Sequence, residues 1–215
     1  MIINMSCAFS QDIDKAISDI DSKLGKNQLT ISAVLSDPFF IYLHSKTAFR
    51  EVIKKHAKPG KVTMITKDEP GKKITVKVSI INSSGKPLNN AVVYLYHTSD
   101  KGWYSDTAAH ITTGKGDHGH ARLFCYAKTD GTGQLEIETI QAKGYPASDL
   151  PAHIHVQAWK DGELVAGVPG ELLFDDDPRL TPERKARSIR DGFLVEKNTG
   201  TDIKPLYFYK IKLSH

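Results

Sequence analysis

The chain has 215 residues, 40% of them hydrophobic, and a formal net charge of +4. That length can bury one well-formed core, or one core with a helical appendage. The charge is mild and no basic run is dense, so neither a nucleic acid nor a membrane is expected as a partner. The two cysteines, Cys7 and Cys125, form no CxxC pair, which argues against a disulfide framework and a cysteine zinc site.

Targeting signals are weak in this sequence. No apolar run approaches the roughly 18 residues that a membrane-spanning helix needs. The first residues lack the basic stretch that opens a signal peptide. We therefore expect a soluble, cytoplasmic protein, although an exported form that has lost its targeting segment would have the same sequence.

The beginning of the chain has a helical pattern. Residues 10–24 carry apolar side chains at helical spacing, with Ser10 suited to cap the helix and Gly25 to end it. A second helix is predicted over residues 38–57, which start with a proline and are followed by Lys-Pro-Gly. We predict a helical segment over residues 1–60, which could form a homodimer interface or cover one side of the remaining chain.

From residue 61 onwards the pattern is that of short strands separated by turns. Residues 73–80 alternate apolar and polar side chains, as a half-buried strand does. Thr181 is suited to cap a short helix that starts at the following proline. Further strands are expected at residues 62–66, 91–96, 122–128, 133–140 and 206–213, around the histidines near residue 154, and at residues 164–174 with a break at Pro169-Gly170. This pattern predicts a mainly β fold, an antiparallel β-sandwich domain over residues 61–215.

Residues 144–157 combine a tyrosine with two closely spaced histidines. Residues two apart in a strand share one face, so His153 and His155 point the same way while Ile154 points into the core. Their Cα atoms would be roughly 6–7 Å apart, which suits two imidazoles that hold one metal ion. Tyr145 lies just upstream between a glycine and a proline, on a predicted turn.

Tyrosine is an uncommon metal ligand because the pKa of its phenol is about 10. A hard, highly charged cation such as Fe(III) can displace that proton, and two tyrosinates with two imidazoles would offset much of the 3+ charge. We therefore expect a second tyrosine. Tyr104 is the best candidate, because it follows a predicted strand in a loop that could fold over the same end of the sandwich, although loop tyrosines often merely pack an edge.

Four short sequence motifs lie in order between about residues 60 and 178. They are Gly85-Lys86-Pro87, Gly102-Trp103-Tyr104, Thr129-Asp130-Gly131 with Thr139-Ile140, and Gly144-Tyr145-Pro146 followed by Pro151-Ala152-His153-Ile154-His155. Together they resemble the intradiol ring-cleavage dioxygenases, non-heme Fe(III) enzymes that open catechols between the two hydroxyls.

The resemblance implies a ligand set and an activity. Tyr104, Tyr145, His153 and His155 would bind Fe(III), with Tyr145 and His153 axial and the other two equatorial. The enzyme would incorporate both atoms of O₂ into a catechol-type diol and release a muconate-type product. Tyr145 would also be catalytic, since the incoming diol displaces it.

Two positions depart from the family pattern. Leu150 stands where an arginine is common, so it cannot stabilise negative charge on the substrate. Glu171 stands where a glutamine is common and adds a negative charge. Arg122 could compensate if it reaches the site. We expect all three residues to lie around the ligands and the protein to be an atypical family member.

Other interpretations stay open at this point. His110, His118 and His120 could bind a surface divalent ion, although their glycine-rich, aperiodic surroundings favour solvated loop histidines. The aspartate run at residues 175–177 could suggest Ca²⁺, but it lacks the ligand spacing and favours a turn. As an alternative function, the chain could be a non-catalytic, transthyretin-like β-sandwich binding module, because fold alone does not confer activity. Such a module has no need of the two tyrosines and two histidines.

Overall fold

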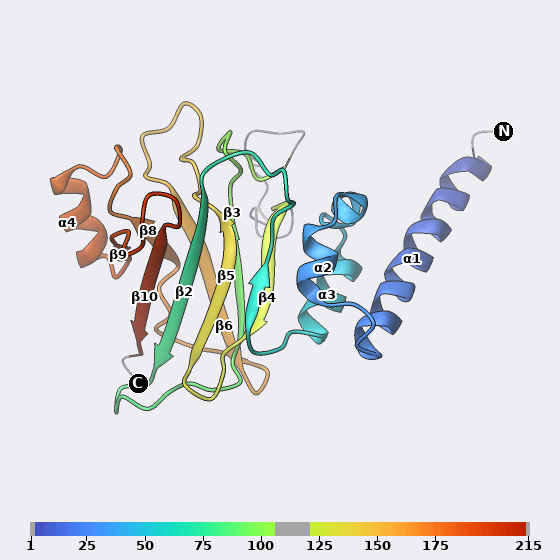
Figure 1. Cartoon of the computed structure of the whole chain (residues 1–215), viewed down its shortest axis with the longest axis horizontal. Coiled ribbons are helices and arrows are strands. Elements are labelled where there is room, and N and C mark those ends of the chain that lie inside the picture. Colours follow the sequence, from blue (N-terminus) through green and yellow to red (C-terminus); the bar gives the residue numbers. More distant parts are fainter. Residues whose placement is uncertain (1–2, 106–120, 214–215) are drawn as a thin grey trace.

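Two β-sheets pack face to face, and helices α2 and α3 lie against one side of them, with α1 beyond (Figure 1). The computed structural model describes residues 3–105 and 121–213, with side chains from residue 12 onwards. Among these residues no helix is long and apolar enough to cross a membrane. The predicted loop with His110, His118 and His120 lies outside the described residues.

The first sheet has four strands in the order β1-β5-β2-β10. Their bounds are Lys61–Thr63 (β1), Gln134–Ile140 (β5), Lys73–Ile81 (β2) and Leu206–Lys212 (β10). The second sheet has the order β4-β3-β6-β8-β9, and β7 pairs with β6 at its side. Its strands are Leu123–Lys128 (β4), Val92–His97 (β3), His153–Lys160 (β6), Glu171–Phe174 (β8), Leu194–Glu196 (β9) and Glu163–Leu164 (β7).

Strand direction departs from the antiparallel prediction, because both sheets are mixed. The central pairs β2–β5, β3–β4, β3–β6 and β6–β8 are antiparallel. The pairs β1–β5, β2–β10 and β8–β9 are parallel. Alternation of apolar and polar residues reports which side chains face the core, and it carries no information on the direction of the neighbouring strand. The mainly β prediction is thus confirmed and the antiparallel one only in part.

Helical structure extends further, and is more broken, than predicted. Helix α1 spans Ile3–Gly25, so it ends at the predicted glycine but starts before Ser10, and a short helix α2 covers Ile31–Ser36. The single helix predicted over residues 38–57 is wrong, because a 3₁₀ helix, η1 (Pro38–Leu43), precedes a separate α3 (Thr47–Lys55). Between them, the imidazole Nδ1 of His44 donates to the carbonyl of Arg122 at 2.8 Å, which ties this break to the start of β4. The sequence gives no sign of that distant partner.

Helix α3 covers the outer face of the second sheet. The guanidinium of Arg50 lies 3.8 Å from the ring centroid of Phe124 and donates to Tyr94 Oη at 3.2 Å. At the C-terminal end, Thr181 caps α4 (Pro182–Arg190) as predicted, by accepting from the amide of Arg184. The N-terminal helices therefore cover one side of the sandwich, while a homodimer through them and a domain boundary at residue 60 stay predictions.

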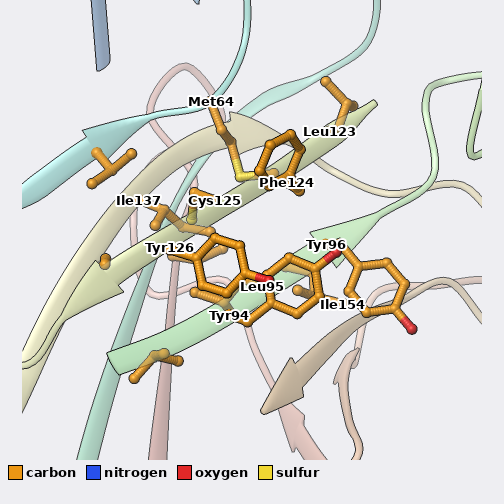
Figure 2. Close-up of a cluster of buried hydrophobic side chains, with 14 of the residues drawn as sticks. Met64, Tyr94, Leu95, Tyr96, Leu123, Phe124, Cys125, Tyr126, Ile137 and Ile154 are labelled. Atoms are coloured by element: carbon orange, nitrogen blue, oxygen red, sulfur yellow. The ribbon is translucent and has the colours of Figure 1, made fainter. Parts of the chain in front are cut away.

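The core lies between the two sheets. Figure 2 shows part of it, with Leu95, Cys125, Ile137 and Ile154 beside a row of aromatic side chains. These four residues have no exposed surface, and Cys125 is a free thiol. Because Ile154 is directed into this core, its neighbours His153 and His155 must face the other side of β6. The core thus fixes the orientation of the two histidines.

Candidate metal centre

The structure brings the four predicted ligands together. Tyr104 Oη lies 2.5 Å from Tyr145 Oη and 2.8 Å from His155 Nε2. His153 Nε2 lies 3.1 Å from Tyr145 Oη and 3.1 Å from His155 Nε2. These four atoms, here called the donor quartet, form a closed circuit of contacts between residues up to 51 positions apart in the chain.

Strand β6 supplies half of the donor quartet. Ile154 is fully buried between its two histidines, and the register of β6 places His155 opposite Tyr96 of β3. The rings of Tyr96 and His155 stack at 4.5 Å with an interplanar angle of 16°. His153 is buried and His155 half-buried. Alternation along one strand therefore confirms the shared face that the sequence predicted.

The two tyrosines come from turns that touch each other. Tyr104 is 2% exposed and follows a turn in which Gly102 has a φ of +75°. A Cβ atom at Gly102 would lie 2.5 Å from the carbonyl oxygen of Gly144, which directly precedes Tyr145. Only a residue without a side chain allows this approach and this φ angle. Tyr145 itself is half-buried and starts the predicted turn, where Ala147 has a φ of +56°.

Proton counting shows that the donor quartet suits a cation. His153 Nδ1 lies 2.8 Å from the carbonyl oxygen of Pro151, which can only accept, so the neutral imidazole carries its proton on Nδ1. Its Nε2 atom then presents a lone pair to the quartet. Two phenols and His155 can bring at most three protons to the four contacts. In the neutral state at least one of the four contacts therefore joins two lone pairs, which a cation in the centre could bind instead.

The donor spacing also fits a metal ion. Neighbouring ligands at bond lengths of about 2.0 Å and right angles lie about 2.8 Å apart, close to the 2.5–3.1 Å observed. Phenolates and imidazoles together match a hard trivalent cation. The residues present therefore fit iron.

Of the three residues expected around the ligands, Glu171 places its carboxylate close to both histidines. It pairs with His155 across β6 and β8, and a carboxylate oxygen lies within 4.8 Å of ring nitrogens of His153 and His155. Leu150 is 50% exposed. The guanidinium of Arg122 makes a bidentate ion pair with Glu69 at 2.8 and 2.6 Å, so the charge that could replace an arginine at position 150 is engaged by a carboxylate.

Sequence reasoning missed three residues that contact this site. Tyr96 could be found only from the β3–β6 register, since nothing local links it to His155. Asp177 accepts from the amide of Ala152 at 2.9 Å, and Arg179 donates to the carbonyl of Tyr145 at 3.1 Å. The aspartate run was correctly predicted as a turn, with Asp177 donating its amide to the carbonyl of Phe174, but its contact with the ligand segment had no local signal.

A cavity of about 310 Å³ lies beside His155. Tyr96 and Gln157 also line it, and the apolar side chains of Val165 and Val168 form its wall. It therefore opens next to one member of the donor quartet, His155, and its lining mixes polar and apolar groups.

Comparison with known proteins identifies related sequences. A sequence model of a family described as dioxygenase matches residues 48–213. Catechol 1,2-dioxygenase of Acinetobacter baylyi is 29% identical over 151 residues, which cover 63% of this chain and 46% of that enzyme. The chain thus spans about half the length of this curated relative.

Solved structures share the fold. Catechol 1,2-dioxygenase from Acinetobacter sp. ADP1 aligns with a TM-score of 0.52 and 20% identity, over 97% of this chain and 84% of that one. An intradiol ring-cleavage dioxygenase from Tetranychus urticae aligns with a TM-score of 0.55 and 16% identity, over 74% of this chain and 88% of that one. At these identities the structures show the fold alone. Because the family match covers more than half of the chain, the chain belongs to the intradiol ring-cleavage dioxygenase family.

Proposed function

We propose that this protein is a non-heme Fe(III) intradiol dioxygenase that uses O₂ to cleave a catechol-type diol to a muconate-type product. One observation above all supports this proposal. Two phenol oxygens and two imidazole nitrogens meet within 2.5–3.1 Å in the donor quartet. A transthyretin-like binding module has no use for such an arrangement, whereas family membership gives it a chemical purpose.

The donor quartet would hold the iron. When bound, Fe(III) supplies a Lewis acid that activates the diol towards O₂. His153 is fixed for this task, since Nδ1 donates to Pro151 and Nε2 is directed inwards. His155 is held by its stack on Tyr96. Both imidazoles therefore need little rearrangement to act as ligands.

Tyr145 has the role of a movable base in this proposal. Tyr104 is 2% exposed and packed against Tyr96, whereas Tyr145 is half-buried on irregular backbone. The phenolate oxygen of Tyr145 takes a proton from an incoming diol hydroxyl and moves away, while Tyr104 stays in place. Its position within hydrogen-bond distance of two other donor atoms allows that transfer.

The surroundings favour an uncharged diol. The cavity beside His155 has a volume of about 310 Å³, and the uncharged side chains of Val165 and Val168 form part of its lining. The carboxylate of Glu171, within 4.8 Å of the ligand nitrogens, would repel a second carboxylate on the substrate. We therefore propose catechol or alkyl-substituted catechols as substrates, in preference to carboxylated diols.

Iron analysis combined with visible spectroscopy and O₂ uptake tests the proposal. Protein loaded with Fe(III) should bind about one iron per chain and show the visible charge-transfer colour of ferric tyrosinate. Tyr104→Phe combined with Tyr145→Phe should abolish the colour, and Tyr126→Phe, a tyrosine outside the donor quartet, should keep it. Uptake of O₂ should follow addition of catechol. Colourless protein that binds no iron would favour the binding module instead.

A further inference from the structure

The segment from Gly144 to Ala152 carries Tyr145 and leads directly into His153, yet it contains neither helix nor strand. Irregular backbone cannot satisfy its carbonyls and amides through a regular hydrogen-bond ladder, so it depends on partners from elsewhere. A ligand on such a segment keeps its position only if those partners hold it. This raises the question of what fixes Tyr145.

Arg179 reaches this segment from the connection between β8 and α4. Its Nη1 atom donates to the carbonyls of Tyr145, at 3.1 Å, and Leu150, at 3.4 Å. One guanidinium thus bridges the two ends of the turn that follows Tyr145. Hydrogen bonds from a charged donor are stronger than those between neutral groups.

Gly144 makes room for this guanidinium. A Cβ atom at Gly144 would lie 2.0 Å from Arg179 Nη1 and 2.7 Å from the carbonyl oxygen of Leu150. Any side chain at position 144 would therefore displace the guanidinium from its two carbonyl partners. The glycine and the arginine form one structural unit, although they lie 35 positions apart in the sequence.

Asp177 anchors the backbone of the same arginine. Its Oδ1 atom accepts from the amide of Arg179 at 2.7 Å, and its Oδ2 atom accepts from the amide of Ala152 at 2.9 Å. Arg179 therefore contacts the ligand segment just after Gly144, and Asp177 contacts it just before His153. The two contacts together fix the path between two ligands of the donor quartet.

We propose that Arg179 is a positioning residue, which holds the phenol of Tyr145 in the donor quartet by binding the carbonyls on either side of its turn. The inference rests on the proposed function, because it gives Tyr145 a metal to bind. The backbone restraint itself exists without metal. Two measurements can therefore separate the restraint from the chemistry.

Amide hydrogen exchange of the metal-free protein measures the restraint. Arg179→Met should speed exchange in peptides covering residues 144–152 at least several-fold, since two carbonyl contacts are lost. Arg187→Met removes an exposed arginine on α4 and should leave those peptides unchanged. Unchanged exchange in folded Arg179→Met protein would overturn the proposal.

The ferric-tyrosinate band measures the effect on the ligand. Arg179→Met and Gly144→Ala act from opposite sides of the same contact, so both should shift and weaken the band and lower kcat/KM by up to about 10²-fold. The double variant should be little worse than Gly144→Ala alone, because a side chain at position 144 already displaces the guanidinium. Arg179→Lys keeps a cationic donor and should recover part of the band.

The outcomes distinguish this proposal from the proposed function. Wild-type protein without a visible band after loading with Fe(III) would contradict the function, while the exchange result still decides whether Arg179 restrains the segment. A normal band and normal kcat/KM in Arg179→Met and Gly144→Ala would refute the positioning role and leave the dioxygenase intact. Additive losses in the double variant would also refute it.

Discussion

Acid should weaken the fold through His97, at the end of β3. This side chain has no exposed surface. Its Nδ1 atom donates to the carbonyl of Thr98 at 2.7 Å, and its Nε2 atom accepts from Thr139 Oγ1 at 2.6 Å. Thr98 in turn donates from its hydroxyl to the carbonyl of Lys143 at 2.6 Å, one residue before the ligand segment. His97 therefore links the core to the approach of Tyr145.

Burial lowers the pKa of His97 from 6.5 to about 4, against a smaller opposing effect of its hydrogen bond to Thr98. Between these two values the unfolded chain binds a proton that the folded chain does not, so the free energy of unfolding falls as the pH falls. Each unit of difference in pKa corresponds to about 1.4 kcal/mol, so the full loss is about 3 kcal/mol between pH 6.5 and 4. Above pH 6.5 the contribution is complete.

Urea unfolding of the metal-free protein between pH 4.5 and 8 measures this loss. Metal-free protein is needed because acid also protonates the ligands of a bound ion. His97→Gln keeps an amide donor and acceptor but cannot titrate, so its free energy of unfolding should lose this slope. The difference between wild type and His97→Gln should shrink by about 2 kcal/mol from pH 7 to pH 4.5.

The reasoning fails if that difference stays constant over the whole range. Carboxylates such as Asp21 and Glu138, whose pKa values are lowered mainly by hydrogen bonds to Lys55 and Lys61, lose their contribution only as the pH falls below about 4.5. Above that pH, the change in the free energy of unfolding therefore reports His97 rather than these carboxylates.

Three further variants test the site. Gly102→Ala forces a Cβ to 2.5 Å from the carbonyl oxygen of Gly144 at a φ of +75°. Urea titration should show a free energy of unfolding that is lower by about 1–3 kcal/mol, and bound iron should be released faster. Glu171→Gln removes a negative charge near the ligand nitrogens, which should lower KM for carboxylated catechols about fivefold relative to catechol in O₂-uptake assays. Leu150→Arg should tighten catecholate binding and raise turnover, and unchanged kinetics would show that position 150 does not stabilise substrate charge.

The part of the site that could be predicted from the sequence depends on local rules. Alternation along β6 is enough to place His153 and His155 on one face, and the buried Ile154 between them confirms it. Tyr145 was placed on a turn by its glycine and proline neighbours. Tyr104 needed more than local rules, since only the order of several motifs linked it to a histidine 51 positions away.

The features that could not be predicted all depend on distant partners. The 38–57 helix breaks where His44 bonds to Arg122, 78 positions further along the chain. Strand β10 pairs in parallel with β2, which lies far upstream in the chain, and no periodicity in the sequence indicates this pairing. Arg179 lies just after the aspartate run and has no pattern that indicates its contact with Tyr145. Local patterns determine faces and turns, whereas tertiary contacts determine which turns meet.

The supports of the donor quartet differ in a way that suits a ligand exchange. His153 and His155 belong to a central strand with its opposite face in the core, and Tyr104 is buried beside Tyr96. Tyr145 sits on an irregular segment held by side-chain contacts, chiefly those of Arg179. If Tyr145 leaves when substrate binds, as proposed, it needs a restraint that is specific but weak enough to release. Two hydrogen bonds from a single Nη1 atom meet that need better than burial in a strand would.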